Sequence, residues 1–209
     1  MWLEYELLTH PEFNGVFCVS TSYRQEPNPI PGRHETIFPM FEFEAKGGME
    51  ELLALEKELL VYLGFWNIDS FSIANYGQTA QLCLTKELTS TDEMSLRKDH
   101  DKPVHFITHF PESTHPFWNM KRSGDLANKI DVILCGMETI GSAQREVDPV
   151  IMKERFYTIS NGWYAQKLFD HFGKERVEAE LETFLAHDFF PRDGGGIGIT
   201  RLIRALKNK

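Results

Sequence analysis

The 209-residue sequence lacks several features that would assign it to a special class of protein. No apolar run approaches the roughly 20 residues needed to span a bilayer. The first six residues contain neither a basic segment nor a long apolar one, which argues against a secretory signal. Only three cysteines occur, far apart and without a CxxC pair, so no disulfide framework is expected. They fit reduced thiols, and we expect a cytoplasmic protein.

Basic residues are also scarce. The chain has 22 lysines and arginines against 31 acidic residues, a formal net charge of −9. An acidic chain is a poor default binder of nucleic acid, because phosphate binding needs clustered Lys and Arg, although a local basic patch stays open. With 42% apolar residues, a core can form, and the length suits one domain over residues 1–209.

The first third of the chain predicts a long hairpin. Residues 16–19 form a short apolar run that is typical of a buried strand, and the proline-rich stretch 25–32 predicts a loop. From residue 40 to 44, apolar and acidic residues alternate, so Glu42 and Glu44 share one face of a second strand.

The remaining elements are predicted from periodicity and breakers. Leucines at 52, 55, 59 and 63 indicate an amphipathic helix over 49–63. The other expectations are a mixed, strand-rich stretch over 69–91, an exposed excursion over 90–102, strands over 104–110 and 130–135, helices over 161–172 and 174–186, and a glycine-rich strand entering a helix over 193–202. Antiparallel strands with peripheral helices predict an α+β fold.

Three arginines are the first candidates for chemistry. Arg24 and Arg33 lie at either end of the hairpin loop, and Arg201 follows a segment with four glycines in five positions. Guanidinium groups match phosphate geometry, so three of them on a rigid sheet could hold a triphosphate. Taken singly, each arginine is better explained as an exposed surface charge. The glycine segment lacks GxxxxGK[ST] and is not the usual nucleotide loop.

Two carboxylates flank the apolar run at 132–135. Asp131 precedes it and Glu138 follows it, with Gly136 allowing a bend. Beside nucleotide phosphates, two carboxylates would suit Mg²⁺. On spacing alone, an ordinary strand end explains them better.

Several segments, in order along the chain, resemble class II aminoacyl-tRNA synthetases. Residues 23–44, with YRQE, RHE and FEFE, resemble motif 2, and GGGIGITRL at 194–202 resembles motif 3. Within that family the chain is similar to the aspartyl and asparaginyl branch, through FP…PFWNMKR at 110–122 and METIGSAQRE at 137–146. The resemblance covers nearly the whole chain. It implies the catalytic core of that family, a mainly antiparallel sheet flanked by helices.

The resemblance also implies residue roles. It places ATP at Arg24, Glu26, Arg33, His34, Phe38, Glu138, Gly196, Gly198 and Arg201. Arg24 would grip the α-phosphate and Arg201 would lie near the γ-phosphate, both as catalytic residues. Phe38 would stack on adenine. Mg²⁺ would be held by Glu138 together with Asp131.

For the amino acid, the resemblance implies a second set of contacts. These are Glu42 at the ammonium, Arg145 at the side-chain end, and Glu4 and Glu6 in the segment that faces a carboxamide. Aspartyl enzymes carry a lysine where Tyr5 stands, so its absence weakens the aspartyl interpretation.

Some expected parts of the family pattern are absent. Motif 1, which builds the dimer interface, and the anticodon-binding barrel have no counterpart, so we expect a core that is truncated at its N-terminus and leave a homodimer open. Thr200 stands where tRNA ligases of this branch have an acid, which resembles ammonia-dependent asparagine synthetase.

The expected function is therefore a ligase that activates an amino acid, aspartate first, with ATP and releases pyrophosphate, using ammonia as acceptor to make asparagine. The alternatives are the catalytic body of an aspartyl or asparaginyl-type tRNA ligase and a nucleotide-binding paralogue without catalysis. The expected partners are ATP, Mg²⁺ and aspartate or asparagine, with tRNA less favoured and no membrane.

Overall fold

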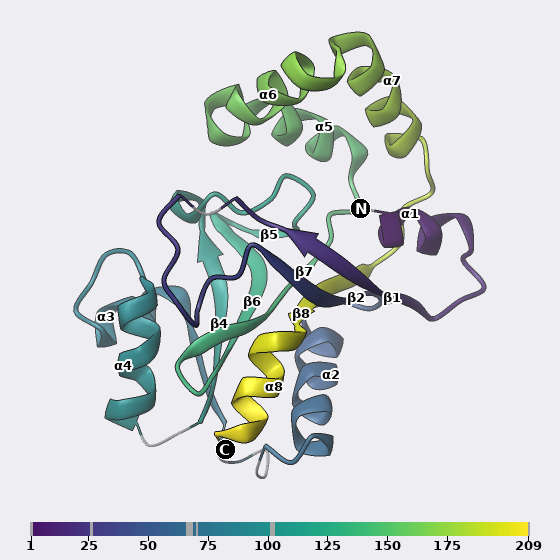
Figure 1. The fold of residues 1–209 in the computed structure, drawn as a ribbon. Helices are drawn as coiled ribbons and strands as arrows, with labels where there is room; N and C mark the ends of the chain where they lie inside the picture. The colour runs from purple at the N-terminus through teal and green to yellow at the C-terminus, as the bar shows by residue number, and fades with distance from the viewer. Residues whose placement is uncertain (1, 26, 66–68, 70, 101–102, 209) are drawn as a thin grey trace.

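The computed structural model describes every residue except 1, 26, 66–68, 70, 101–102 and 209. A mixed sheet of eight strands forms the centre of the described structure, with helices around it (Figure 1). The strands are β1 (Gly15–Tyr23), β2 (Ile37–Lys46), β3 (Ser72–Asn75), β4 (Val104–Pro111), β5 (Arg122–Ser123), β6 (Leu126–Leu134), β7 (Met137–Gln144) and β8 (Arg192–Gly198). The helices are α1 (Trp2–Thr9), α2 (Met49–Tyr62), α3 (Tyr76–Leu82), α4 (Ser90–His100), α5 (Pro149–Thr158), α6 (Trp163–Phe172), α7 (Lys174–Leu185) and α8 (Ile199–Lys207), with short 3₁₀ turns η2 (Glu112–Thr114) and η3 (Ile159–Gly162).

The sheet is mainly antiparallel. Its strands lie in the order β1-β2-β8-β7-β6-β4-β3, with β5 paired to β6. Only β3 and β4 pair in parallel among the described strands. The last strand in sequence, β8, is therefore inserted between β2 and β7, antiparallel to both. This arrangement confirms the predicted α+β class.

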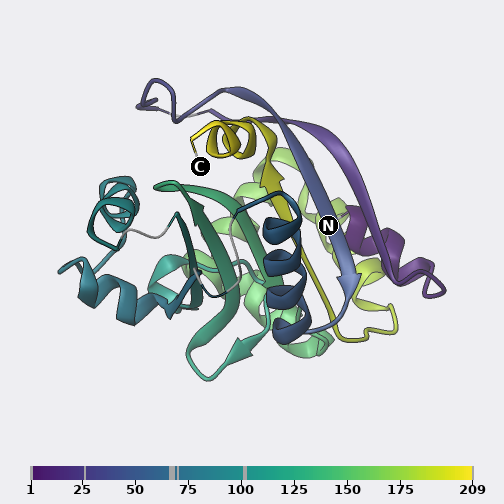
Figure 2. The same cartoon turned by 90° about the horizontal axis from the view of Figure 1, so that it is seen from below.

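One face of the sheet is covered by α2 and α8, which lie side by side (Figure 2). Leu52 and Leu60 of α2 are fully buried and belong to one apolar cluster with Ile130 and Val132 of β6. The helix predicted at 49–63 is therefore confirmed, although Leu55 of the predicted apolar face is 45% exposed and Leu60 is buried instead. Because strand residues alternate between faces, Lys129 and Asp131 of β6 point to the opposite side of the sheet.

The hairpin forms as predicted, but the buried strand expected at residues 16–19 is wrong: β1 is an edge strand, and Phe17 and Val19 are 69% and 68% exposed. β1 and β2 pair along their whole length, and the Arg24 N–H donates to the Thr36 carbonyl at 2.9 Å as the loop begins. The strand at β6 follows the sequence with small differences. The strand expected at 130–135 begins earlier and stops at Leu134, because Cys135 adopts a left-handed φ of 52° in the turn into β7.

Two polar stretches fold differently from the prediction. The stretch 69–91 was expected to be rich in strands, but its described residues form one strand, β3, followed by helix α3. Asn75 caps α3 by accepting a hydrogen bond from the Gln78 N–H at 2.8 Å. The exposed excursion expected at 90–102 contains helix α4, whose Leu96 is buried against Ile107 and Ile133. One buried leucine among charged residues is too weak a pattern to predict this packing.

The helices α5, α6 and α7 form a separate layer, away from α2 and α8 (Figure 1). Their core contains Phe156, Leu181 and Phe184 packed around the fully buried Trp118. Among the described residues, no helix combines the length and the apolar character that crossing a membrane requires.

A buried carboxyl group lies at the interface between α2 and the sheet. Glu56 is 1% exposed and its Oε1 accepts a hydrogen bond from Ser142 Oγ at 2.6 Å, while its Oε2 has no hydrogen-bond partner. Burial raises the pKa of Glu56 from 4.5 to about 8. The folded protein therefore binds this proton more tightly than the unfolded chain does.

The first prediction concerns Glu56→Gln, which mimics the protonated side chain. Because the folded-state pKa is the higher one, the wild-type protein loses stability as pH rises from about 4.5 to about 8, whereas the variant does not lose this contribution. The free energy of unfolding of the variant should exceed that of the wild type at pH values above 8, and this difference should shrink towards pH 5. Urea unfolding over this pH range measures it.

The matched control is Glu58→Gln, which removes an exposed carboxylate from the same helix. Its stability should follow that of the wild type at every pH. A Glu56→Gln variant with the wild-type pH dependence would contradict the assignment.

Candidate active site

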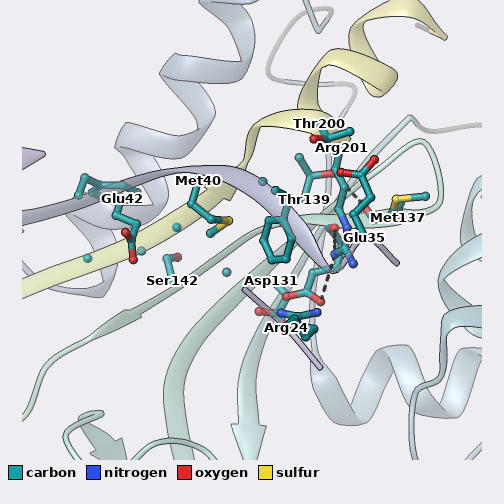
Figure 3. Close-up of a pocket in the computed structure, with 18 of the residues that line it drawn as sticks. Arg24, Glu35, Met40, Glu42, Asp131, Met137, Thr139, Ser142, Thr200 and Arg201 are labelled. Atoms are coloured by element: carbon teal, nitrogen blue, oxygen red, sulfur yellow. Dashed lines mark hydrogen bonds and ion pairs between the residues drawn. The ribbon is translucent and has the colours of Figure 1, made fainter. Parts of the chain in front are cut away.

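A cavity of about 500 Å³ opens on the face of the sheet opposite α2. Its walls come from the β1–β2 hairpin, from β6, β7 and β8, and from the first turn of α8. Figure 3 shows Glu42 at one end and Arg24, Asp131 and Arg201 towards the other. The cavity therefore joins segments that lie at opposite ends of the sequence.

The predicted phosphate-binding residues lie at the second of these ends. Arg24, Arg33, His34 and Arg201 all line the cavity. Arg201 Nη1 donates to the Glu138 carbonyl at 2.7 Å, and Arg33 pairs with the Glu93 carboxylate of α4. Burial lowers the pKa of Arg201, and Glu138 opposes that effect. The hairpin and α8 thus bring cationic side chains to one place.

An aromatic ring accompanies these cations. Phe38 lines the same cavity, and the Arg24 guanidinium carbon lies 5.5 Å from the centroid of its ring. This is a cation–π distance, and it places a flat apolar surface beside the phosphate-binding candidates. Glu26, the predicted adenine contact, lies outside the described residues.

Strand β8 forms the floor of the cavity, and four of its seven residues are glycines. A Cβ atom at Gly194 would lie 2.2 Å from Cδ of Glu44, and one at Gly195 would lie 2.5 Å from Cβ of Ser142. Gly196 and Gly198 also line the cavity. Gly194 and Gly195 are therefore required by the close approach of neighbouring strands, not by left-handed backbone angles.

The predicted metal pair is only partly suited to Mg²⁺. Asp131 and Glu138 both line the cavity, but Asp131 Oδ2 is held by Lys129 Nζ at 2.6 Å and Oδ1 has no hydrogen-bond partner. Burial raises the pKa of Asp131 to about 7, with Lys129 opposing the rise and Glu138 adding to it. No cluster of three or more His, Cys, Asp or Glu that could hold a metal occurs within the described part of the chain. Glu138 is the accessible carboxylate of the pair, with its side chain 41% exposed.

Carboxylates dominate the other end of the cavity. Glu42 Oε2 accepts a hydrogen bond from Ser20 Oγ at 2.6 Å. Glu44 accepts one from Arg145 Nε at 3.1 Å, and burial raises the pKa of Glu44 against the opposing effect of Arg145. Asp193 of β8 is buried and does not line the cavity; burial raises its pKa to about 7, and Glu44 adds to the rise. Two lining acids, Glu42 and Glu44, therefore lie at this end beside one arginine, which favours a cationic group.

Glu4 and Glu6, predicted as substrate contacts, are not among the residues lining the cavity. Glu4 is 1% exposed and its carboxylate accepts hydrogen bonds from Arg192 Nε at 3.0 Å and Asn119 Nδ2 at 2.8 Å. This buried ion pair fixes α1 to the start of β8 and corrects the predicted position of Glu4. Glu6 lies near His10 on the outer side of α1.

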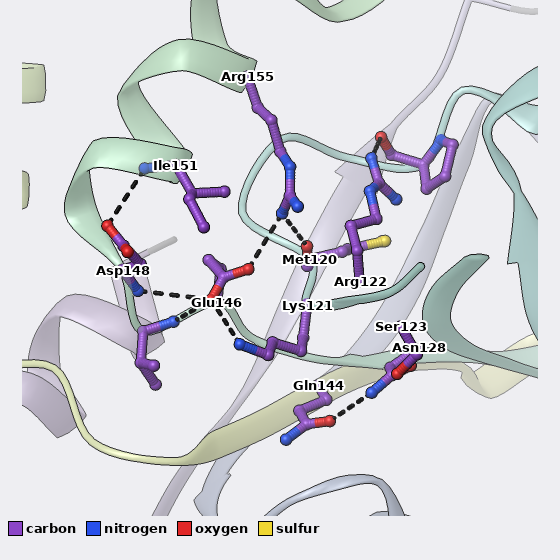
Figure 4. Close-up of polar contacts among 12 residues, drawn as sticks. Met120, Lys121, Arg122, Ser123, Asn128, Gln144, Glu146, Asp148, Ile151 and Arg155 are labelled. Carbon is purple, nitrogen blue, oxygen red and sulfur yellow. Dashed lines mark hydrogen bonds and ion pairs between the residues drawn. The ribbon is translucent and has the colours of Figure 1, made fainter. Parts of the chain in front are cut away.

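A second polar network lies just beyond Arg145 (Figure 4). Glu146 accepts hydrogen bonds from Lys121 Nζ at 2.9 Å and from Arg155 Nη1 at 3.1 Å, which links β7 to α5. Burial alone would raise the pKa of Glu146, but the hydrogen bonds from Lys121 and from the Val147 N–H hold it below its usual range. Asp148 then caps α5 by accepting from the Val150 N–H at 2.8 Å.

Sequence reasoning did not single out Lys129, Glu35, Met40 or Thr139, all of which line the cavity. For Lys129 the signal was available. It lies two residues before Asp131 on a strand, so the two side chains share one face.

Comparison with known proteins gives a consistent result. The family model for class II tRNA synthetases (D, K and N) matches residues 3–209. A curated relative, the aspartate–tRNA(Asp) ligase of Pyrobaculum aerophilum, is 29% identical over 104 residues, which cover 50% of this chain and 22% of that protein.

Solved structures agree in fold. The asparaginyl-tRNA synthetase of Pyrococcus horikoshii, complexed with asparaginyl-adenylate, aligns with a TM-score of 0.77 at 20% identity over 98% of this chain and 51% of that one. The aspartyl-tRNA synthetase of Entamoeba histolytica aligns with a TM-score of 0.74 at 17% identity, over 98% and 47%. The chain thus spans about half the length of these structures.

The second prediction tests the floor of the cavity. Gly195→Ala should destabilise the protein by about 1–3 kcal/mol or more, because the new methyl group meets Ser142 and the Gly141 carbonyl, neither of which can move freely. Gly196→Ala is the matched control, since its methyl group would meet only the flexible end of Met40. Thermal unfolding of the two variants measures the difference, and equal melting temperatures would contradict this account.

Proposed function

The chain belongs to the class II tRNA synthetases (D, K and N), and from this premise we propose that it joins ATP to an amino acid of the aspartate or asparagine type as an aminoacyl-adenylate. In this proposal, residues 1–209 act as the catalytic body of an aminoacyl-tRNA ligase. One observation carries the proposal. Arg24 and Arg201 lie 177 positions apart in the sequence, yet their guanidinium groups line one cavity together with the ring of Phe38.

The cationic end suits the nucleotide. Arg24, Arg33 and Arg201 offer planar donors that match phosphate oxygens bidentately. The ring of Phe38 offers a surface on which a base can stack. Gly196 and Gly198 leave the backbone of β8 open to a ligand on the cavity face, since Ile197 between them is buried in the apolar cluster on the other face.

The acidic end suits the amino acid. Glu42 is held in place by Ser20 and is not paired with a basic side chain in the described structure, so its carboxylate can accept the substrate ammonium. Arg145 lies beside Glu44 and lines the cavity, where its guanidinium can donate to the side-chain oxygen of aspartate or asparagine. Glu44 offsets much of the positive charge of Arg145. A neutral carboxamide therefore fits this arginine better than a second carboxylate, which would need a positive charge of its own.

The chemistry needs little proton transfer. One oxygen of the amino-acid carboxylate attacks the α-phosphorus of ATP in line, a P–O bond forms, and pyrophosphate leaves with the electron pair of the broken bond. Such a step depends on holding both reactants in line and on balancing the charge of the phosphates. The opposed acidic and basic ends of the cavity provide these two conditions.

The acceptor proposed is tRNA. The curated relative and the similar structures are named as tRNA ligases or synthetases, whereas the expected synthesis of asparagine from ammonia gains no support from them. Ammonia is therefore kept as an outcome of the experiment.

The third prediction is the activation step itself. ATP–pyrophosphate exchange, measured with each amino acid in turn and Mg²⁺ in the buffer, should occur with asparagine or aspartate and with no other. Charging of bulk tRNA with that amino acid would support the ligase. Formation of asparagine from aspartate and ammonium without tRNA charging would support the ammonia-dependent reaction. Exchange with no amino acid, despite ATP binding, would reject both.

The fourth prediction concerns Arg201→Ala. Loss of this guanidinium should reduce exchange by about 10²–10³-fold, because a charge at the phosphates is no longer balanced. The melting temperature should stay close to that of the wild type, since the side chain is partly exposed and lines a cavity. Arg176→Ala, on the exposed face of α7, is the control and should leave exchange unchanged. Normal exchange in Arg201→Ala would remove this residue from the proposed site.

A further inference from the structure

A lysine pairs with one of the two carboxylates that were predicted to bind a metal. Lys129 and Asp131 lie on the same face of β6, and Nζ of Lys129 lies 2.6 Å from Oδ2 of Asp131. Both side chains are largely buried, at 24% and 12% exposure. An ammonium this close to a shielded carboxylate is a persistent ion pair and not a transient surface contact.

The geometry around Gly141 explains why this position matters. A point one bond length from the Gly141 Cα, where a Cβ would stand, lies 3.3 Å from Glu138 Oε1 and 3.5 Å from Asp131 Oδ1. The two carboxylates therefore converge over a residue that has no side chain. Hard divalent cations favour such a convergence of carboxylate oxygens.

Lys129 is also fixed from its other side. Its ammonium lies 4.0 Å from the centroid of the Phe110 ring, a buried aromatic residue of β4. The ring attracts the cation electrostatically, and Asp131 holds it by a charge-assisted hydrogen bond. Glu138, in contrast, lies 4.0 Å from the guanidinium of Arg201 and is the more exposed acid.

We propose that Asp131 holds the ammonium of Lys129 in place of a divalent cation. This side of the cavity then presents a neutral ion pair in place of a metal-binding carboxylate, while Glu138 remains the carboxylate available to a cation that arrives with the nucleotide. The proposal rests on the proposed function for the identity of the nucleotide. Its first consequence, that Asp131 does not bind divalent cations in the wild-type protein, can be tested without nucleotide or turnover.

The experiment measures Mn²⁺ binding to the nucleotide-free protein by electron paramagnetic resonance, at mildly alkaline pH where carboxylates are ionised. Wild type and Asp131→Asn should bind Mn²⁺ with the same weak affinity. Lys129→Met, which keeps the length of the side chain and removes its charge, should bind Mn²⁺ about tenfold more tightly or better. Lys129→Met/Asp131→Asn should lose this gain, and Lys129→Arg should behave like the wild type.

The control is Lys153→Met, which removes a lysine from an ion pair with Glu182 on the surface. It should leave Mn²⁺ affinity unchanged. Weaker Mn²⁺ binding by Asp131→Asn than by the wild type would overturn the proposal, and this comparison holds even if Lys129→Met fails to fold. An unchanged affinity in a folded Lys129→Met would overturn it as well. Failure of pyrophosphate exchange alone would reject the proposed function and leave these binding results standing.

Discussion

The site depends on one steric constraint, the insertion of a glycine-rich strand between two strands that carry charges. β8 lies between β2 and β7, and its glycines leave room for Glu44 on one side and Ser142 on the other. Any side chain at Gly194 would occupy the position of the Glu44 carboxylate. Because Glu44 then lies against Arg145, the residue that follows β7, the glycines permit an ion pair that reaches across β8 where β8 has no side chain. The floor of the cavity is polar because the glycines of β8 have no side chains that would cover these charged groups.

Buried charges are the second feature that follows from this arrangement. Arg192 and Glu4 pair at the start of β8, Arg145 and Glu44 pair beside it, and Lys129 and Asp131 pair on β6. Each pair removes two ions from water, which is tolerable only because hydrogen bonds accompany the charges. The first pair anchors α1 to β8 outside the cavity, whereas the other two line the cavity, whose acidic end contains Glu42 and whose basic end contains Arg24 and Arg201. A substrate with an ammonium at one end and phosphates at the other matches that division.

The sequence predicted the parts of the molecule that depend on local spacing. Leucines three and four apart predicted α2, alternation predicted the shared face of Glu42 and Glu44, and the glycines predicted β8 followed by α8. It failed where the partner is distant or the pattern is faint. Glu4 was expected in the substrate pocket, but its partner Arg192 is 188 positions away and no spacing rule relates them. The helix α4 depends on one buried leucine among charged residues, a pattern that polar loops share.

The low identity of the similar structures bears on which residues determine the fold. At 17–20% identity the backbones still superpose with TM-scores of 0.74 and 0.77. Few individual side chains can be shared at that level, so the fold must depend mainly on the strand order, the buried apolar alternation and the glycines of β8. The role of an individual cavity side chain does not follow from the fold. The ammonium of Lys129 contacts Asp131 and the face of the Phe110 ring, and its chemistry must be established in this chain and not transferred from the fold.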